Sequence, residues 1–378
     1  MAGIYLHIPF CRQACNYCDF YFTTKQNKKD EFVQALLLEL DLKKNRLDGH
    51  EPIETYYFGG GTPSQLSDKH IDDILNILYK WYPIISGGEI TLEVNPDDLS
   101  PERIRRWKAA GINRLSLGIQ SLDEAQLHWM HRAHTAGQAL SAVAMCQDAG
   151  ITNLTLDLIY GLPKTQLGAW EKQLLWLKDQ QVPHFSAYAL TLEPRTRLSK
   201  EIANGIQTPL EDSEMINCFT ILESFIHSTN YEAYEISNFS LPGFRAKHNS
   251  AYWSGKPYLG FGPSAHSFIS PHRIHTLPDL NSYLTQLINF NQLPPHSIEN
   301  LTEHDFINEY ILTRLRTIEG INLNFLQEKY NYDLSKEFPS ELQEWNTKGW
   351  IQYSEENISL TWKGRLQADG ISSSLFKI

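Results

Sequence analysis

The feature that most constrains the fold is a regular alternation of apolar segments and amphipathic stretches over the first half of the chain. Such a repeat predicts strands joined by helices, and strands joined in this way run parallel with right-handed crossovers. The expected strands are residues 3–8, 54–58, 89–94, 113–118, 152–158 and 184–190. We therefore expect an α/β fold with either an open doubly wound sheet or a barrel-like sheet. In both, binding sites form at the carboxyl ends of the strands.

Capping signals mark where the intervening helices begin. Ser67 is a good N-cap for a helix that reaches residue 81, and Pro101 suits the first position of the next helix. The other expected helices are residues 30–47, 123–149 with one break, and 166–179.

The pattern weakens after residue 192. Residues 231–300 are rich in Asn, Ser, Pro, Gly and aromatic residues, which predicts a loop-rich segment with short strands. Helical patterns return at 303–317, 324–330 and 339–348, and residues 350–353 and 358–361 suit a hairpin. We therefore predict a core domain over 1–230, a connecting segment over 231–300 and a small, winged-helix-like C-terminal domain over 301–378.

Composition and charge exclude several classes of protein. The chain has 378 residues and a net charge of −11, which disfavours nucleic-acid binding because phosphate contacts need clustered Lys and Arg. No apolar run approaches the roughly 18 residues of a membrane span, and the first residues lack the features of a signal peptide. We expect a cytoplasmic protein. Contact with a membrane surface and homodimer formation stay open.

Three of the five cysteines lie within eight residues, as Cys11-x3-Cys15-x2-Cys18. Such clustering points to metal or cluster ligation rather than to disulfides. In a [4Fe–4S] cluster, three thiolates leave one iron open to a small chelating ligand. A structural zinc ion would need a fourth ligand. The third alternative is three buried thiols without a metal.

The residues around these cysteines carry a family resemblance. The stretch Tyr5-Leu6-His7-Ile8-Pro9-Phe10-Cys11, followed by Asn16-Tyr17-Cys18-Asp19-Phe20, resembles the radical S-adenosylmethionine (SAM) enzymes. Within them it resembles the branch that holds oxygen-independent coproporphyrinogen III dehydrogenases and heme chaperones. The resemblance implies a partial (β/α)6 barrel and a [4Fe–4S] cluster on Cys11, Cys15 and Cys18. It also implies SAM at the open iron, whose reductive cleavage yields a 5′-deoxyadenosyl radical.

The resemblance extends to residues that follow successive strands. Gly59-Gly60-Gly61-Thr62-Pro63 comes directly after the second strand, where glycines let the backbone approach a ligand closely. Each of the other polar residues, taken alone, is more often an ordinary surface or cap residue, so their joint match carries the argument. The implied SAM contacts are Gly60, Gly61 and Thr62 at the amino group, Gln120 and Asp157 at the ribose, Arg132 at the carboxylate, Glu93 nearby, and Tyr5.

A second signature lies in residues 247–253. His-Asn-x-x-Tyr-Trp, starting at His248 in an aromatic-rich loop, resembles a signature of the heme chaperones. The resemblance implies heme as a ligand, with His248 as the candidate axial ligand of its iron. Tyr252 and Trp253 are aromatic rings that suit a porphyrin face, and His266 is a weaker candidate ligand. A hydrogen-bonded structural histidine is the alternative.

Two departures distinguish the members of the branch. The dehydrogenases carry a further cysteine where this chain has Phe20, and they have an extension ahead of the first strand, which begins here by Gly3. The sequence therefore favours a heme chaperone that delivers heme to apo-hemoproteins, with membrane-associated respiratory proteins as one class of acceptor. The alternative is oxidative decarboxylation of coproporphyrinogen III to protoporphyrinogen IX. In the chaperone interpretation no residue is assigned a catalytic role.

Overall fold

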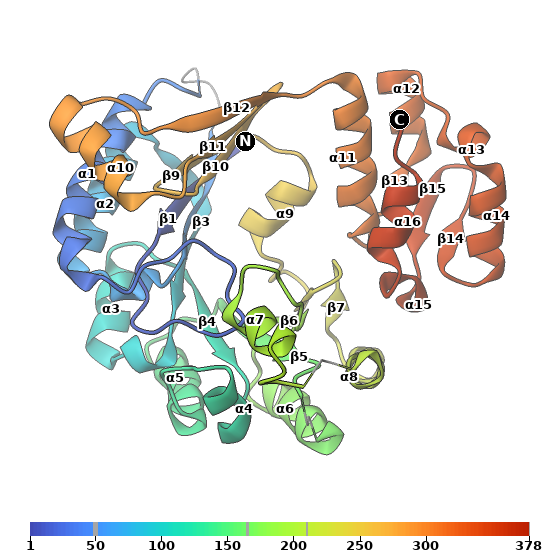
Figure 1. Cartoon of the computed structure of the whole chain (residues 1–378), viewed down its shortest axis with the longest axis horizontal. Helices are drawn as coiled ribbons and strands as arrows, with labels where there is room; N and C mark the ends of the chain where they lie inside the picture. Colours follow the sequence, from blue (N-terminus) through green and yellow to red (C-terminus); the bar gives the residue numbers. More distant parts are fainter. Residues whose placement is uncertain (48–51, 164–165, 209–210, 378) are drawn as a thin grey trace.

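Six parallel strands form the centre of the molecule in a computed structural model that describes residues 1–47, 52–163, 166–208 and 211–377. They occupy neighbouring positions in chain order, and helices cover one side of the sheet (Figure 1). The strands are β1 (Ala2–Ile8), β2 (Ile53–Gly60), β3 (Ile84–Val94), β4 (Arg114–Gln120), β5 (Leu154–Tyr160) and β6 (His184–Ala189). The helices between them are α1 (Lys29–Leu42), α2 (Asp68–Trp81), α3 (Pro101–Ala109), α4 (Glu124–Trp129), α5 (Ala136–Asp148) and α6 (Leu167–Asp179).

The two faces of each strand differ in chemistry. On β1, Ile4, Leu6 and Ile8 are fully buried in the core. Successive side chains of a strand alternate between faces, so Tyr5 and His7 point to the opposite, inner face. Helix α2 complements the apolar side by burying Ile71, Ile74, Leu75 and Leu78, at the spacing of one helix face. The apolar core therefore lies between sheet and helices, and the inner face is left for polar side chains.

Local capping explains where two of the predicted helices begin. Ser67 accepts a hydrogen bond from the backbone N–H of His70, and Ser100 accepts one from that of Arg103, with Pro101 at the first helical position. Both starts confirm the prediction. Strand β3 is longer than predicted, since it begins at Ile84 rather than Glu89.

The central sheet extends at both edges, giving twelve strands in the order β12-β11-β10-β9-β1-β2-β3-β4-β5-β6-β8-β7. Its ends are separate edges, so the sheet is a partial rather than a closed barrel, as the resemblance implied. The added strands are β7 (Glu232–Ala233), β8 (Asn238–Ser240), β9 (Tyr258–Phe261), β10 (His266–Ile269), β11 (His272–Thr276) and β12 (His296–Asn300). Short strands were expected in this segment, but their addition to both edges was not.

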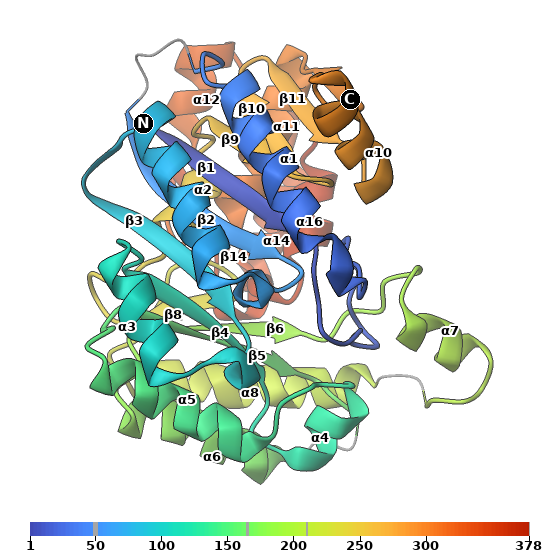
Figure 2. The ribbon, with the colours of Figure 1, turned by 90° about the vertical axis from the view of Figure 1, so that its left-hand side faces the viewer.

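The region after β6 contains helices that the sequence did not predict. They are α7 (Arg197–Ala203), α8 (Asp212–His227), α9 (Lys247–Trp253) and α10 (Leu280–Leu284). Helix α7 projects away from the body of the molecule (Figure 2). Its Leu198 joins a small apolar cluster with Leu127 and Met130, which lie next to the cysteine segment. No helix in the described residues is both long and apolar enough to cross a membrane.

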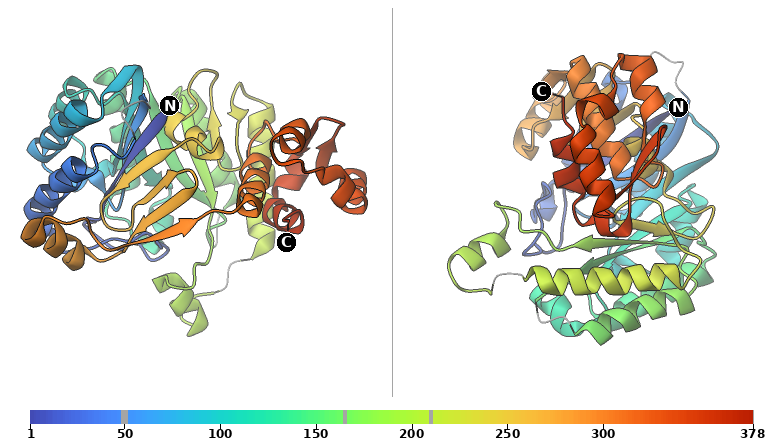
Figure 3. Two further views of the ribbon diagram at one scale, coloured as in Figure 1. Left: turned by 90° about the horizontal axis from the view of Figure 1, so that it is seen from above. Right: turned by 90° about the vertical axis from the view of Figure 1, so that its right-hand side faces the viewer.

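The C-terminal elements have an apolar core of their own, which runs from Ile307 to Leu375. They lie at the end of the molecule away from α1 and α2 (Figure 3). The predicted hairpin is present, because β14 (Ile351–Tyr353) pairs antiparallel with β15 (Asn357–Leu360). The other elements are α11 (Glu303–Leu315), β13 (Ile321–Asn322), α12 (Leu323–Tyr330), α13 (Leu334–Glu337), α14 (Pro339–Thr347), α15 (Trp362–Arg365) and α16 (Ala368–Ser374).

This C-terminal part is joined to the sheet by directed polar contacts. The Arg365 guanidinium donates to the backbone carbonyls of Glu235 (3.0 Å) and Ala233 (2.8 Å), at the β7 edge. Arg245 pairs with Glu319 at 2.7 Å. The division into three regions at residues 230 and 300 stays a prediction, and its middle region contributes strands to the main sheet.

Candidate cluster and cofactor site

The segment that carries the three cysteines links β1 to α1. Two backbone hydrogen bonds close it, from Thr23 N–H to the Pro9 carbonyl (2.6 Å) and from Cys11 N–H to the Thr23 carbonyl (3.0 Å). Cys11, Cys15 and Cys18 are all free and half-buried. Burial raises the pKa of the Cys11 thiol to about 11 and that of Cys18 to about 12. Thiolate ligation by these residues therefore requires a strongly attractive metal centre.

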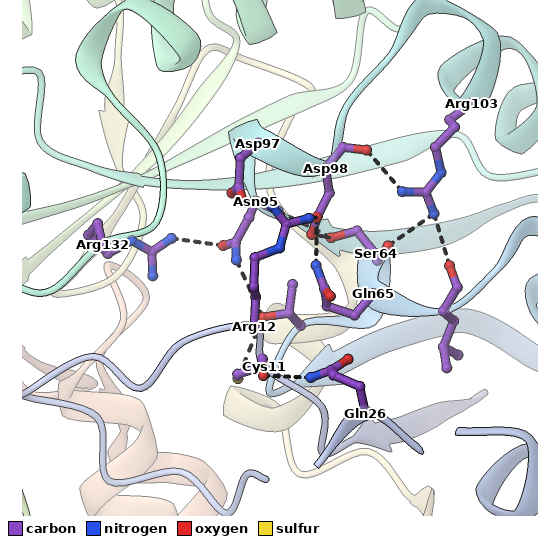
Figure 4. Close-up of polar contacts among 12 residues, drawn as sticks. Cys11, Arg12, Gln26, Ser64, Gln65, Asn95, Asp97, Asp98, Arg103 and Arg132 are labelled. Carbon is purple, nitrogen blue, oxygen red and sulfur yellow. Dashed lines mark hydrogen bonds and ion pairs between the residues drawn. The ribbon is translucent and has the colours of Figure 1, made fainter. Parts of the chain in front are cut away.

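Arg12 fastens this segment to the ends of the neighbouring strands (Figure 4). Its guanidinium pairs with Asp97 and with Asp98, both at 2.8 Å. The Asp98 carboxylate is buried and also accepts from Ser64 Oγ (2.7 Å) and Gln65 Nε2 (2.5 Å). The cysteine segment is thus held against the residues that follow β2 and β3.

The glycines at the end of β2 lie where no side chain fits. Gly60 has φ of +112°, and a Cβ there would come within 2.8 Å of the His7 ring. A Cβ on Gly61 would come within 2.9 Å of the Pro9 backbone and 3.0 Å of the Cys11 sulfur. These contacts explain why glycine is needed, and they place the backbone of the motif against the cysteine segment.

Glu93, at the end of β3, positions the glycine motif. Its carboxylate accepts from Tyr57 Oη (2.7 Å) and from the backbone N–H of Gly60 (3.2 Å). Tyr5 stacks against Tyr57 with ring centroids 6.1 Å apart. Burial, with a contribution from the charge of Asp157, raises the pKa of Glu93 to about 7. The carboxyl group is therefore poised to gain or lose a proton near neutral pH.

Arg132 connects several strand ends to the cysteines. Its Nη2 donates to Asn95 Oδ1 and to the Gly118 carbonyl, both at 2.7 Å, and Nη1 donates to Cys15 Sγ at 3.3 Å. Figure 4 shows the bond to Asn95, whose amide also reaches Thr62 Oγ1 at 3.4 Å. In the described part of the chain, the buried Nε of Arg132 has no hydrogen-bond partner. A buried donor without a partner indicates a place for an anionic group.

Gln120 and Asp157 complete the row of strand ends. Gln120 has φ of +60°, an uncommon conformation for a residue other than glycine. A Cβ on Gly118 would lie 3.0 Å from Gln120 Nε2 and 3.4 Å from Arg132 Nη2, so both side chains crowd this backbone. Asp157 accepts from Ser116 Oγ at 3.0 Å, and Ser116 is the cross-strand partner of Glu93.

The structure thus brings the SAM-site residues predicted from the sequence to one end and the inner face of the sheet. Sequence reasoning missed Arg12 and Asn95, which hold the site together. The sequence could have indicated Asn95, since this residue directly follows a strand and precedes a proline. No local pattern indicates that Arg12 holds the cysteine segment in place.

The chemistry of these residues fits an iron–sulfur cluster with an amino-acid-like ligand. Three thiols supply the soft ligands that iron–sulfur clusters use. The glycine backbone forms a cradle that any Cβ would fill, and the Arg132 guanidinium offers an unused buried donor.

His248 lies deeper than the sequence suggested. It is only 2% exposed, and it stands on α9 rather than in a loop, which corrects the prediction. The helix forms because the Glu89 carboxylate accepts from the backbone N–H groups of Lys247 (3.1 Å) and His248 (3.2 Å). Glu89 is more than 150 positions away in sequence, so no local pattern reveals this cap.

Both ring nitrogens of His248 are occupied. Nδ1 is 2.7 Å from Thr55 Oγ1, and Nε2 is 2.8 Å from Tyr252 Oη. The ring stacks on Tyr57 with centroids 4.9 Å apart. Burial lowers the pKa of His248 to about 3, so the imidazole is neutral. In this arrangement the His248 ring packs against the rings of Tyr5 and Tyr57 and holds them in place.

Comparison with known proteins places this chain in a family. Residues 5–175 match the radical SAM superfamily, and residues 301–366 match the HemN C-terminal domain. The heme chaperone HemW of Bacillus subtilis is 34% identical over 97% of both chains. The chain belongs to the HemW family of radical SAM proteins. A mitochondrial radical SAM domain-containing protein 1 from Bos taurus is 32% identical over 99% of this chain and 87% of its own.

A solved structure of coproporphyrinogen III oxidase (HemN) from Escherichia coli, described as a radical SAM enzyme, has the same fold. Its TM-score is 0.85, with 21% identity over 100% of this chain and 90% of that one. This likeness confirms the radical SAM fold and its C-terminal domain. Because it concerns shape alone, it does not distinguish HemW from HemN.

Proposed function

We propose that this chain is a heme chaperone that holds a [4Fe–4S] cluster, SAM and heme, and delivers heme to apo-hemoproteins. The observation that carries the proposal is the similarity to heme chaperone HemW over 97% of both chains. Phe20 supports it further. It stands where the dehydrogenases have an additional cysteine, and its side chain is 72% exposed.

The proposed cluster ligands are Cys11, Cys15 and Cys18. Arg12 holds their segment against Asp97 and Asp98, while Thr62 Oγ1 donates to Cys11 Sγ at 3.5 Å. A [4Fe–4S] cluster held by these three thiolates would be the electron donor for SAM bound at its open iron.

The proposed SAM contacts divide by chemistry. The backbone of Gly60 and Gly61 and the hydroxyl of Thr62 receive the amino group, with Glu93 setting the position of Gly60. Arg132 offers its unused Nε to the carboxylate. Gln120 and Asp157 lie along the next strand ends for the ribose hydroxyls, and Tyr5 flanks the site.

His248 remains a proposal for the heme ligand, with one condition. Its Nε2 is bonded to Tyr252, so coordination of iron requires that hydrogen bond to break. The neutral imidazole is otherwise suitable, because a metal ligand must be unprotonated.

Hemin titration and an anaerobic enzyme assay test the proposal together. After cluster reconstitution, the protein should bind hemin with a defined Soret band. The same preparation, given SAM, a reductant and coproporphyrinogen III, should form no protoporphyrinogen IX. Efficient decarboxylation without stable heme binding would replace the proposal with the dehydrogenase activity. A Phe20→Cys variant is the matched control, and it should retain hemin binding.

A further inference from the structure

A row of polar side chains continues from Asp157 across the inner face of the sheet toward its β7 edge. Ser186 on β6 is the register partner of Asp157 on β5, and Asn238 on β8 is the register partner of Ser186. Phe185 and Phe239, their neighbours in the sequence, are buried in the apolar core on the other face. Alternation along the strands therefore places Asp157, Ser186 and Asn238 side by side on the inner face.

The hydrogen bonds along this row have a fixed direction. An ionised Glu235 carboxylate can only accept, so the Asn238 side chain turns its Nδ2 group toward it and donates. The Oδ1 atom of Asn238 then faces Ser186 and accepts from its Oγ at 2.7 Å. Glu235 thus fixes the orientation of the Asn238 amide, and the amide fixes the place of the Ser186 hydroxyl.

Glu235 is itself held by the C-terminal part of the chain. It is only 1% exposed, and its backbone carbonyl accepts from the Arg365 guanidinium at 3.0 Å. It also pairs with Thr317 in an isolated backbone bridge. Burial raises the pKa of the Glu235 carboxyl, and the charges of Arg316 and Arg365 oppose that shift. This end of the row is therefore fixed by residues outside the six-stranded core.

At the other end of the row, Asp157 differs in exposure from the two residues behind it. Asp157 is half-buried, whereas Ser186 and Asn238 are 2% and 4% exposed. Tyr188, two positions further along β6 and on the same face, is 41% exposed, so the neighbouring surface is open. A ligand on the inner face can therefore reach Asp157, while Ser186 and Asn238 lie behind it.

Two serine hydroxyls act on the Asp157 carboxylate. Ser116 Oγ donates to it at 3.0 Å. Burial raises the pKa of Asp157, and hydrogen bonds from Ser186 and Ser116 oppose that shift. Because a hydroxyl has one proton, Ser186 donates either to Asp157 or to Asn238, and its Oγ stays between the two in both cases. Ser186 is thus a donor within reach of a carboxylate that has to accept from ribose hydroxyls.

We propose that Ser186 and Asn238 are positioning residues for the ribose of SAM: they hold the Asp157 carboxylate in the orientation that accepts from the ribose hydroxyls, without touching the ligand. The inference rests on the proposed SAM contact of Asp157. It adds two residues to the site, from β6 and β8, and it connects the site to the C-terminal part of the chain through Glu235.

Binding of two ligands to four proteins tests this assignment. The ligands are S-adenosylhomocysteine and its 2′,3′-dideoxy analogue, which lacks both ribose hydroxyls. Isothermal titration calorimetry measures their dissociation constants on the reconstituted wild type, Ser186→Ala, Asn238→Ala and Ser240→Ala. We expect the wild type to prefer S-adenosylhomocysteine, and Ser186→Ala to lose on the order of tenfold in affinity for it with little change for the analogue.

The two remaining variants grade and control this effect. Asn238→Ala should give a smaller loss in the same direction, because the Ser186 hydroxyl remains but is no longer held. Ser240→Ala is the matched control and should keep the wild-type preference. Its hydroxyl is buried on the same face of β8 and, among the residues that the structure describes, makes no hydrogen bond.

The outcomes separate this inference from the proposed function. A wild type that binds neither ligand defeats the proposed SAM site itself, and one that binds both equally well defeats the ribose role of Asp157. A wild type that prefers S-adenosylhomocysteine, with the same preference in Ser186→Ala, overturns the inference alone. Equal losses for both ligands in Ser186→Ala would show a merely structural role and would also overturn it. A selective loss in Ser240→Ala as large as that in Ser186→Ala would do the same, and an unchanged preference in Asn238→Ala would overturn the assignment of Asn238.

Discussion

The cysteine segment and the His248 helix are both marked by sequence motifs, yet the fold treats them differently. The cysteines stay half-buried, and their neighbours leave an unused donor, the Nε of Arg132, in the described site. His248 is enclosed, with both ring nitrogens engaged by Thr55 and Tyr252. A sequence motif therefore marks a region under constraint, but only packing tells whether its side chains bind a ligand or support the fold.

The largest expected effect comes from substitutions in the cysteine segment, which should remove the iron–sulfur cluster. Cys11→Ala, Cys15→Ala and Cys18→Ala should each abolish the cluster, because each removes one of three thiolates. Iron and sulfide counts after anaerobic reconstitution should fall from close to four of each per chain in the wild type to a small remainder. Cys146→Ala and Cys218→Ala are the controls, because both lie in the buried core. A full cluster in Cys15→Ala would contradict the assignment.

Removing Arg132 should weaken SAM binding next most strongly. Arg132→Ala deletes a buried cation, and we expect a loss of about 2–5 kcal/mol in SAM binding free energy. The change is measured by following the electron paramagnetic resonance signal of the reduced cluster as SAM is added. Arg105→Ala, on the exposed side of α3, is the control and should leave the titration unchanged. A SAM titration of Arg132→Ala identical to that of the wild type would show that Arg132 does not bind the SAM carboxylate.

For the helix that carries His248, we expect a loss of folding stability when its capping residue, Glu89, is removed. Glu89→Ala leaves the N-terminus of α9 and the buried Arg114 without their carboxylate, which is 3.8 Å from the guanidinium. Breaking a buried pair by removing one partner costs about 3–5 kcal/mol of unfolding free energy. Urea denaturation measures it. Glu54→Ala removes a partly exposed pair with Lys256 and should cost less than about 1 kcal/mol. Equal losses in the two variants would mean that Glu89 has no special role.

For Glu93 we expect a smaller effect on the free energy of unfolding, and one that depends on pH. Its pKa is about 7 in the folded protein and 4.5 in the reference state, so the native state binds the proton more tightly. The contribution of Glu93 to stability is therefore full below pH 4.5 and is lost as the pH rises through about 7. The loss should not exceed about 3.4 kcal/mol. The difference in unfolding free energy between wild type and Glu93→Gln, followed from pH 4 to pH 8, isolates it. A constant difference would show that Glu93 does not titrate in this range.

Much of the fold could be predicted because its signals are local. The six central strands and the starts of α2 and α3 follow from periodicity and from caps a few residues away. Helix α9 could not be predicted, because its cap, Glu89, comes from β3. The pairing of β9 with β1 is also invisible locally, since it joins Gly260 to Tyr5.

The same distinction applies to the candidate site. The family motifs pointed to the cysteines, the glycines and the strand-end residues, which the fold brings together. They did not reveal Arg12 as an anchor, because its partners Asp97 and Asp98 are recognisable only once β1 and β3 are placed together. Nor did they show that His248 is enclosed, which depends on Thr55 and Tyr57 from β2.

Heme transfer tests the central claim most directly. The reconstituted protein is loaded with heme, separated from excess hemin and mixed with an apo-hemoprotein whose holo form has a distinct Soret band. The account predicts that the acceptor band appears while the heme band of this chain declines, and that the iron–sulfur cluster stays intact. Heme that remains on the chain at excess acceptor would contradict the account.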